Sequence, residues 1–339
     1  MKSPSPVQSD LFERPETASA SPMEDAGPRL AFPLKRRDRT DRPEPSADPE
    51  AMAVALEATG RYRVLRQLQP RPIAAWPEAG APGAGIAVIL DTETTGLDAR
   101  RDEVIELGMV AVTYDAHGIG VVVDVYSELR EPGVPISAEI TRITGISQDM
   151  VAGRSIDPQA VAAFVARADL VVAHNATFDR PFCERLAPGF DTLRWACSVA
   201  EVDWTARGYE GAKLGYLVGQ SGWFHQGHRA VDDCHALLEV LARPRRPSET
   251  PPFLDLLAAA SRRRCRIWAE GSPFHTKDLL KARGYRWNDG TDGRAKSWWV
   301  EVEEAAFETE LAFLRTEIFR AAIDPPIRWM DATERFRIG

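Results

Sequence analysis

The chain has 339 residues, a length that predicts about two domains of ordinary size. Its 42 Lys and Arg against 50 Asp and Glu give a net charge of -8, which argues against a protein that coats nucleic acid with its whole surface. The four Cys lack C-x-x-C spacing and no apolar run reaches the roughly 18 residues of a membrane span, so the sequence excludes a dense disulfide framework and favours a soluble, cytoplasmic protein without a membrane partner.

The first segment, residues 1–50, contains nine of the 25 Pro and only two aromatic side chains, Phe12 and Phe32. Because so little apolar surface cannot offset the entropy of an ordered chain, we expect a disordered tail. Residues 51–85 are expected to hold a helix and a linker. The helix pattern begins at Pro49, is interrupted at Gly60 and ends near Leu68, before a stretch rich in Gly, Ala and Pro.

The central segment, residues 86–244, carries a net charge of -10 and alternates strand and helix patterns. Three apolar, β-branched runs lie close enough together for an antiparallel meander, and a fourth predicts a buried strand between helices. This order predicts a mixed sheet flanked by helices. The predicted strands are residues 86–90, 104–112, 119–126 and 170–173, and the predicted helices are residues 138–143, 158–168, 178–186, 213–219 and 230–241.

A charged, Pro-rich segment, residues 245–260, predicts a linker to a small α+β domain at residues 261–339. Within this domain the pattern predicts a strand, a helix and two further strands. Ser272 is the expected N-cap of the helix and Gly284 its expected C-cap. A long final helix is predicted from Glu303 to about Arg320.

Residues 261–300 carry a net charge of +6 with aromatic side chains between the basic ones. Bases stack on aromatic rings while Arg and Lys follow phosphates, so this composition predicts a DNA-binding platform for single strands. The alternative is that the Trp side chains form the core of the small domain, which we expect for at least two of the four. The four are Trp268, Trp287, Trp298 and Trp299.

Two acids, Asp91 and Glu93, stand two residues apart at the carboxyl end of the first central strand. Side chains at positions i and i+2 of a strand point to the same face, so both carboxylates are expected at one spot. They would repel one another unless a hard cation lies between them. A solvated acidic pair is the alternative for these two residues alone.

Two further acids are candidates for the same site. Asp179 lies in the first turn of a predicted helix after a buried strand, where the helix dipole alone could favour it. Asp233 shares a helix face with Leu237 and Val240 and so points inward, where a carboxylate needs a hydrogen bond or a metal. His228, just before this helix, could accept a proton near neutral pH.

Four carboxylates on three elements, with one His, would suit two Mg²⁺ or Mn²⁺ ions. Two such ions stabilise the attacking and leaving oxygens of an in-line phosphoryl displacement. The sequence therefore predicts hydrolysis of a phosphodiester.

Three motifs together resemble those of the DEDDh 3′–5′ exonucleases, the family of the DNA polymerase III epsilon subunit. They are D-T-E-T-T-G at residues 91–96, H-N-A-T-F-D at 174–179 and H-R-A-V-D-D at 228–233. The resemblance covers residues 86 to about 242. It implies an RNase H-like fold, with a mixed five-stranded sheet flanked by helices, and removal of nucleotides from the 3′ end of DNA in proofreading or repair.

The resemblance also implies roles for individual residues. Asp91 would bridge both metal ions, Glu93, Asp179 and Asp233 would complete the ligands, and His228 would be the general base. Thr94, Thr95 and Glu139 match substrate-contacting positions, whereas Thr144 stands where many relatives have His. His174 and Asn175 are interpreted as architectural. The other four His, at 117, 225, 235 and 275, are interpreted as surface or packing residues.

Two alternative functions remain open. An RNA-trimming nuclease would use the same catalytic set, and a catalytically inactive nucleic-acid-binding protein could keep the fold. A DNA polymerase is a possible partner. The sliding clamp is another, because Gln8-Ser9-Asp10-Leu11-Phe12 resembles the clamp-docking peptide Q-L-[SD]-L-F of bacterial replication and repair proteins, with Ser9 as the departure.

Overall fold

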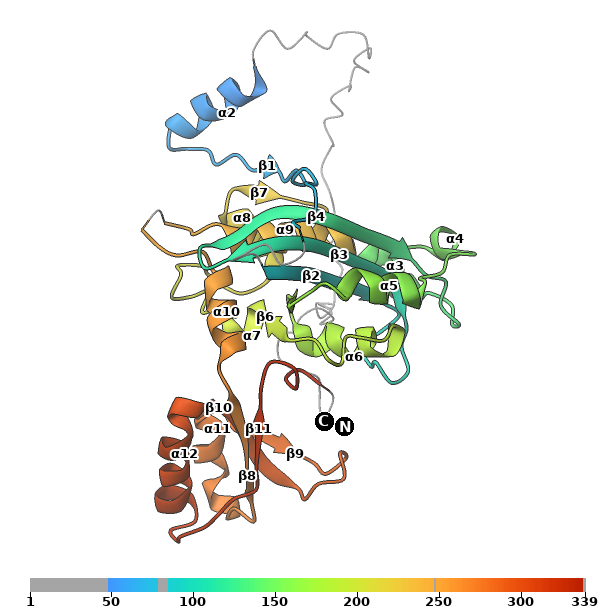
Figure 1. Ribbon diagram of the computed structural model, residues 1–339. Helices are drawn as coiled ribbons and strands as arrows, with labels where there is room; N and C mark the ends of the chain where they lie inside the picture. Colours follow the sequence, from blue (N-terminus) through green and yellow to red (C-terminus); the bar gives the residue numbers. More distant parts are fainter. Residues whose placement is uncertain (1–47, 79–84, 247, 338–339) are drawn as a thin grey trace, which may run out of the picture. The chain divides into compact units, whose positions relative to one another are not determined.

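The computed structural model describes residues 48–78, 85–246 and 248–337 (Figure 1). The chain divides into two compact units, one up to Arg61 and one from Tyr62 onward. The predicted tail, except for its last three residues, and the clamp-like segment lie outside the described residues. No helix in the described parts of the chain is both long and apolar enough to cross a membrane.

The described part of the first unit contains helix α2 (Pro49–Ala58). The carboxylate of Asp48 caps its start by accepting from the amide of Glu50 at 3.2 Å. The predicted extension to Leu68 is wrong, because Gly60 follows the helix in the left-handed region at φ 69°. Residues 66–67 instead form a short strand, β1 (Arg66–Gln67), in the second unit.

A mixed five-stranded sheet organises the second unit, as predicted (Figure 1). Its strand order is β4-β3-β2-β5-β6, with the first three strands antiparallel and the last two parallel to β2. The meander prediction is confirmed, but β6 was not predicted. The strands are β2 (Gly85–Thr94), β3 (Val104–Asp115), β4 (Gly118–Leu129), β5 (Leu170–Ala173) and β6 (Trp195–Cys197).

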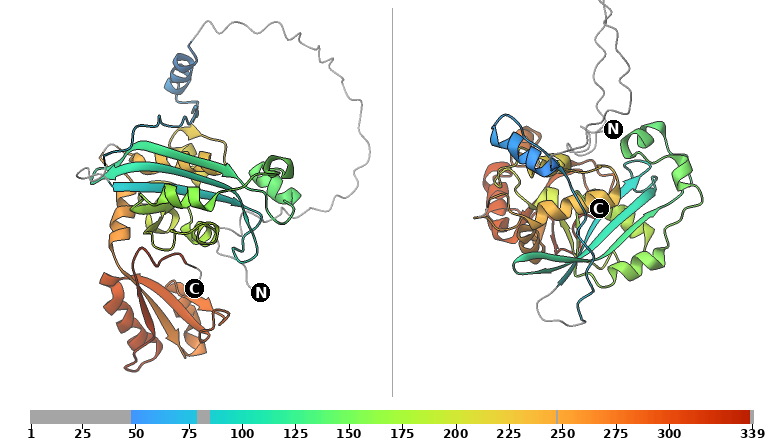
Figure 2. Two further views of the ribbon diagram at one scale, coloured as in Figure 1. Left: turned by 45° about the vertical axis from the view of Figure 1, so that its right-hand side comes forward. Right: turned by 90° about the horizontal axis from the view of Figure 1, so that it is seen from above.

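Helices cover both faces of this sheet because β2 is apolar on both (Figure 2). Ile89 packs with α8 and α9 side chains in one core, and Leu90 packs with α5 and α6 side chains in the other. Each predicted helix is present within a few residues. The helices are α3 (Ala138–Thr144), α4 (Gln148–Val151), α5 (Pro158–Val165), α6 (Ala176–Leu186), α7 (Ser198–Glu201), α8 (Leu214–Gln220) and α9 (Ala230–Ala242).

Segments outside the predicted central domain also join this fold. Strand β1 pairs in parallel with β7 (Trp223–Phe224), and Ile73 bridges to Val122. The second half of the predicted linker is helix α10 (Phe253–Ser261) instead. It forms because its apolar residues recur with helical spacing, and Phe253 is fully buried against the α9 side of the core.

The C-terminal region forms a second sheet of four antiparallel strands, in the order β11-β8-β10-β9, which confirms a small α+β fold. Its helical segment begins with a 3₁₀ turn after Pro273, so Ser272 is not the N-cap. The predicted long helix from 303 to 320 is divided into 3₁₀, α and π segments, and β11 was missed. The elements are β8 (Arg264–Glu270), η1 (Phe274–Thr276), α11 (Lys277–Ala282), β9 (Arg286–Asn288), β10 (Ser297–Glu303), η2 (Glu304–Ala306), α12 (Phe307–Phe313), η3 (Leu314–Ile318) and β11 (Ile327–Met330).

Candidate active site

The end of β2 sends its side chains to both faces of the sheet. Asp91 and Glu93 follow Ala87 and Ile89 on the face that α9 covers, since strand side chains alternate. Thr92, between the two acids, points to the opposite face. Both acids are half-buried.

Helix α9 brings the third carboxylate, Asp233, to the same face. Its first turn lies directly on β3, where a Cβ on Gly108 would stand 2.4 Å from the backbone of Ala230. A side chain at position 108 would therefore push the helix away from the sheet. Glu106, two residues earlier on β3, accepts a hydrogen bond from the amide of Ala230 at 3.0 Å and so caps the helix.

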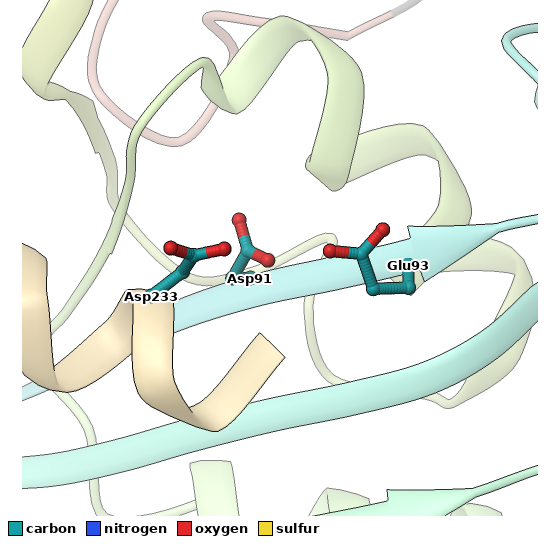
Figure 3. A group of neighbouring side chains, drawn as sticks. All are labelled: Asp91, Glu93 and Asp233. Carbon is teal, nitrogen blue, oxygen red and sulfur yellow. The ribbon is translucent and has the colours of Figure 1, made fainter. Parts of the chain in front are cut away.

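Asp91, Glu93 and Asp233 converge as the sequence predicts (Figure 3). Each offers a carboxylate oxygen within 4.8 Å of those of the other two. Figure 3 shows the Asp233 carboxylate directed toward Asp91, with Glu93 farther along β2. Such a set of oxygen donors is of the kind that Mg²⁺ or Mn²⁺ prefers.

Asp179 lies next to this group without joining it. It is buried in α6, and its Oδ1 accepts from the hydroxyl of Thr92 at 2.8 Å and from the amide of Thr92 at 3.1 Å. Because Thr92 points to the face opposite Asp91 and Glu93, Asp179 approaches the strand end from the α6 side. Its charge still acts on Asp91.

Asp91, Glu93 and Asp179 resist ionisation. Burial raises the pKa of Asp91 well above its usual value, and the charges of Asp179, Asp233 and Glu93 raise it further. Burial and the charge of Asp233 likewise raise the pKa of Glu93 to about 8. The pKa of Asp179 rises to about 7 through burial, against the lowering effect of the Thr92 hydrogen bonds. A cation among these groups would remove their mutual repulsion.

Two His residues contact Asp233 in different ways. His228 is exposed in the left-handed region at φ 63°, and its backbone amide donates to Asp233 Oδ2 at 2.9 Å. Its imidazole makes no hydrogen bond to another described residue. His225, interpreted from sequence as a surface or packing residue, instead places Nε2 2.6 Å from Asp233 Oδ1.

The predicted substrate-contacting residues occupy three settings. Thr94 is buried and its hydroxyl donates to the carbonyl of Gly96 at 2.6 Å. The hydroxyl of Thr95 accepts from the amide of Glu103 at 3.0 Å, which closes the loop after β2. Glu139 is exposed on α3, 3.8 Å from Arg142.

His174 and Asn175 lie where β5 meets α6. Nδ1 of His174 is 2.6 Å from the hydroxyl of Ser198, and burial lowers the pKa of this imidazole to about 4. His174 is therefore neutral at pH 7. Asn175 is the N-cap residue of α6 at φ 134°. Both positions fix the turn that leads to Asp179.

An ion pair beside the site was missed by the sequence reasoning. Arg229, between His228 and α9, donates to both carboxylate oxygens of Glu106 at 2.8 to 3.2 Å. Glu106 stands opposite Glu93 in the β2–β3 register, and the guanidinium of Arg229 lowers the pKa of Glu93. A buried acid in an otherwise apolar strand was the available signal for Glu106.

Comparison with known proteins places this site in a family. A family model described as "Exonuclease" matches residues 88–241, which include all three motifs. The DNA polymerase III subunit epsilon of Treponema pallidum is 32% identical over 160 residues, which are 44% of this chain and 72% of that protein. The chain belongs to this exonuclease family.

The chain is also similar to a much longer protein. The DNA polymerase III PolC-type protein of Thermotoga maritima is 33% identical over 175 residues, 48% of this chain. The chain spans only 12% of the length of that protein. Among solved structures, exonuclease X in complex with 5′ overhanging duplex DNA is 26% identical, with a TM-score of 0.36, and covers 50% of this chain and 99% of its own.

The acidic cluster of this exonuclease-family domain is suited to a divalent cation. Three carboxylates share one small volume, and their oxygens are hard donors. The pKa values of two of them, Asp91 and Glu93, are raised by burial and by the charges of neighbouring acids. Asp233 is held by His225 and by the His228 amide, which orients its carboxylate for ligation.

Proposed function

We propose that the protein is a 3′–5′ exonuclease that removes nucleotides from DNA, in proofreading or repair. The observation that carries the proposal is the convergence of Asp91 and Glu93 from β2 with Asp233 from α9, in a domain of the exonuclease family. These three residues and Asp179 would hold two divalent ions. DNA is favoured over RNA because the epsilon and PolC relatives are named DNA polymerase III proteins.

In this mechanism water attacks the phosphorus of the terminal phosphodiester, and the bond from phosphorus to the 3′ oxygen breaks. Divalent ions bound here would lower the pKa of the attacking water and would stabilise the negative charge on the phosphoryl oxygens. His228 takes the proton of the water. Its ring is exposed, and the backbone amide of the same residue donates a hydrogen bond to Asp233. The products are a nucleoside 5′-monophosphate and a shortened strand with a 3′ hydroxyl.

The other residues would position the substrate and the enzyme. Thr94 and Thr95 would lie against the terminal nucleotide, and Glu139 would contact the substrate from α3. Residues 86–244 would form the nuclease domain, with residues 261–339 as an accessory domain. A polymerase and, through Gln8, Leu11 and Phe12, the sliding clamp are the proposed protein partners.

The proposal is tested with 5′-labelled DNA and RNA strands of equal sequence, with Mg²⁺ or Mn²⁺ and with EDTA. The parent should shorten DNA from its 3′ end only when metal is present. Asp91→Asn should abolish cleavage, and His228→Ala should slow it about 100- to 10,000-fold, as loss of a general base does.

Two results would contradict the proposal. Equal residual cleavage by the parent and both variants would mean that a contaminant cuts the DNA. Faster shortening of RNA than of DNA would assign the chain to the RNA-trimming alternative. His117→Ala is the matched control for His228→Ala, since His117 lies in the β3–β4 turn, and it should cleave like the parent.

A further inference from the structure

The small C-terminal sheet has one face covered by helices and one without them. Its elements run strand, helix, strand, strand, helix, strand, and β8 and β10 are the central strands. Cys265 and Ile267 of β8 pack with Leu280 of α11 and Leu314 of η3 in one core. Figures 1 and 2 show α11 and α12 on this side of the sheet and none on the other.

Alternation along the strands places a pair of Trp side chains on the face without helices. Trp268 of β8 stands opposite Trp299 of β10, and both alternate with residues of the core. The remaining two Trp behave otherwise. Trp298 packs against the core, so the core expectation holds for this residue. Trp287 meets Trp298 edge-on with ring centroids 5.6 Å apart but is itself exposed, so the expectation does not hold for Trp287.

Arginines surround the Trp268–Trp299 pair. The guanidinium of Arg294 lies 4.3 Å from the ring centroid of Trp268, and those of Arg266 and Arg286 lie 4.5 and 5.5 Å from that of Trp299. Trp268 is almost fully covered, whereas Trp299 stays partly exposed. The same face therefore offers an aromatic ring and positive charge side by side.

The charges of Arg286 and Arg294 are available to a ligand. Both side chains are exposed, and neither forms an ion pair with a carboxylate within the described residues. Arg266, by contrast, is paired with Glu301 at 2.6 Å. An unpaired guanidinium next to an aromatic ring is a common partner for a phosphate with a stacked base.

We propose that this face, defined by Trp268, Trp299, Arg266, Arg286 and Arg294, binds single-stranded DNA. Four-stranded sheets with aromatic side chains on their open face recognise single strands by stacking bases on those rings. Here a base stacks on Trp299, and Arg286 and Arg294 bind the flanking phosphates. The choice of DNA rather than RNA rests on the proposed function, while the binding itself needs no cleavage.

The test measures binding of a fluorescein-labelled oligothymidine strand to the full chain in EDTA, by anisotropy. Trp299→Ala should weaken binding about 5- to 100-fold, the range that loss of one base stack corresponds to. Arg286→Glu with Arg294→Glu should weaken it at least as much. Replacing both Arg by Ala should flatten the dependence of log affinity on log salt by about 0.7 for each lost phosphate contact.

Matched controls separate this face from general effects. Trp287→Ala removes an exposed Trp from the opposite face, and Lys281→Glu reverses an exposed charge on α11. Both should bind within twofold of the parent. Cleavage of a thymidine dinucleotide, too short to span a second site, should be the same in the parent and in Trp299→Ala.

The proposal is overturned if the Trp299 and Arg variants bind the strand with the affinity of the parent. It is equally overturned if the two control variants lose as much affinity as the Trp299 and Arg variants. It is also overturned if an RNA strand binds more tightly than DNA through the same residues. Failure of the exonuclease proposal would appear separately, as absence of metal-dependent cleavage in the parent. The Arg variants keep the test decisive if Trp299→Ala does not fold.

Discussion

Glu106 connects the sheet to the helix that carries Asp233. Its carboxylate binds Arg229 through both oxygens and the amide of Ala230, so the charge of a fully buried acid is balanced at the start of α9. The position of α9 in turn sets where Asp233 meets Asp91. We therefore treat Glu106 as a positioning residue for the cluster.

Replacing Glu106 with Gln should reduce metal-dependent cleavage about 10- to 100-fold, the range seen when a residue that orients a metal ligand is lost. The reason is that Gln keeps the size of the side chain but loses the charge that holds Arg229. The metal concentration for half-maximal rate should rise together with this loss. A merely structural role would lower the melting temperature without moving that concentration.

Glu128→Gln is the control for this change, because Glu128 is exposed on the neighbouring strand β4. It should leave both quantities unchanged. If Glu106→Gln cleaves DNA with the rate and metal dependence of the parent, Glu106 does not position the site.

Sequence reasoning reached the acids of the site but not the residues that hold them. The convergence of Asp91 and Glu93 follows from strand alternation, and the inward face of Asp233 follows from helix periodicity. The contact from His225 to Asp233 and the pairing of Glu106 with Arg229 depend on how α9 lies on β3. No local pattern contains that information.

At the scale of elements, the strands and helices with strong periodicity were predictable. The three meander strands alternate or run apolar over many residues, and their pairing is as expected. The two-residue strand β7 and the three-residue strand β6 are too short to leave a pattern. Helix α10 was hidden by the Pro-rich residues before it. Strand β11 lies beyond the predicted long helix, and its four residues are too few to leave a clear pattern.

The segment after β11 returns to the nuclease fold. Ala332 lies in the α9 core, and its carbonyl accepts from the amide of Trp195 at 2.8 Å. Arg335 forms an ion pair with Glu201 at 2.6 Å, and both side chains are almost fully buried. Arg180, next to Asp179 in α6, donates to the carbonyl of Arg335 at 2.7 Å. The nuclease fold thus includes residues well beyond its family domain.

Arg335→Met should lower the free energy of unfolding by about 3 to 5 kcal/mol, because it leaves the buried carboxylate of Glu201 without its main partner. Urea unfolding of the full chain measures this change. Arg337→Met is the matched control. Arg337 is partly exposed and 3.4 Å from Glu184, and a surface pair of this kind contributes about 1 kcal/mol or less. Equal stability of the two variants would refute a structural role for the Arg335–Glu201 pair.

For the whole molecule, the net charge of -8 conceals a division between parts of the chain. Residues 86–244 carry a net charge of -10, which includes the four carboxylates of the site, whereas residues 245–339 carry +2. Three of those carboxylates have raised pKa values. The metal-free protein therefore holds a repulsive cluster in its most acidic part, and the stability of the molecule should depend on both pH and cations.

This dependence has a definite sign. In the unfolded chain the acids lose their protons near pH 4, while in the folded chain Glu93 and Asp179 keep theirs until about pH 8 and 7. Between these values the folded state binds more protons, so stability from these groups is present at low pH and is lost as pH rises from about 4 to 8.

In EDTA, Asp91→Asn should therefore melt several degrees above the parent at pH 8, with a smaller difference at pH 5, because it removes the central charge of the cluster. Mn²⁺ binds the ionised carboxylates in place of protons, so it should stabilise the parent more at pH 8 than at pH 5. Thermal unfolding at both pH values, with EDTA or Mn²⁺, measures both effects. Asp115→Asn, at an exposed strand end, should behave like the parent. A Mn²⁺ shift of equal size at both pH values, or in Asp91→Asn, would contradict a cation site among Asp91, Glu93 and Asp233.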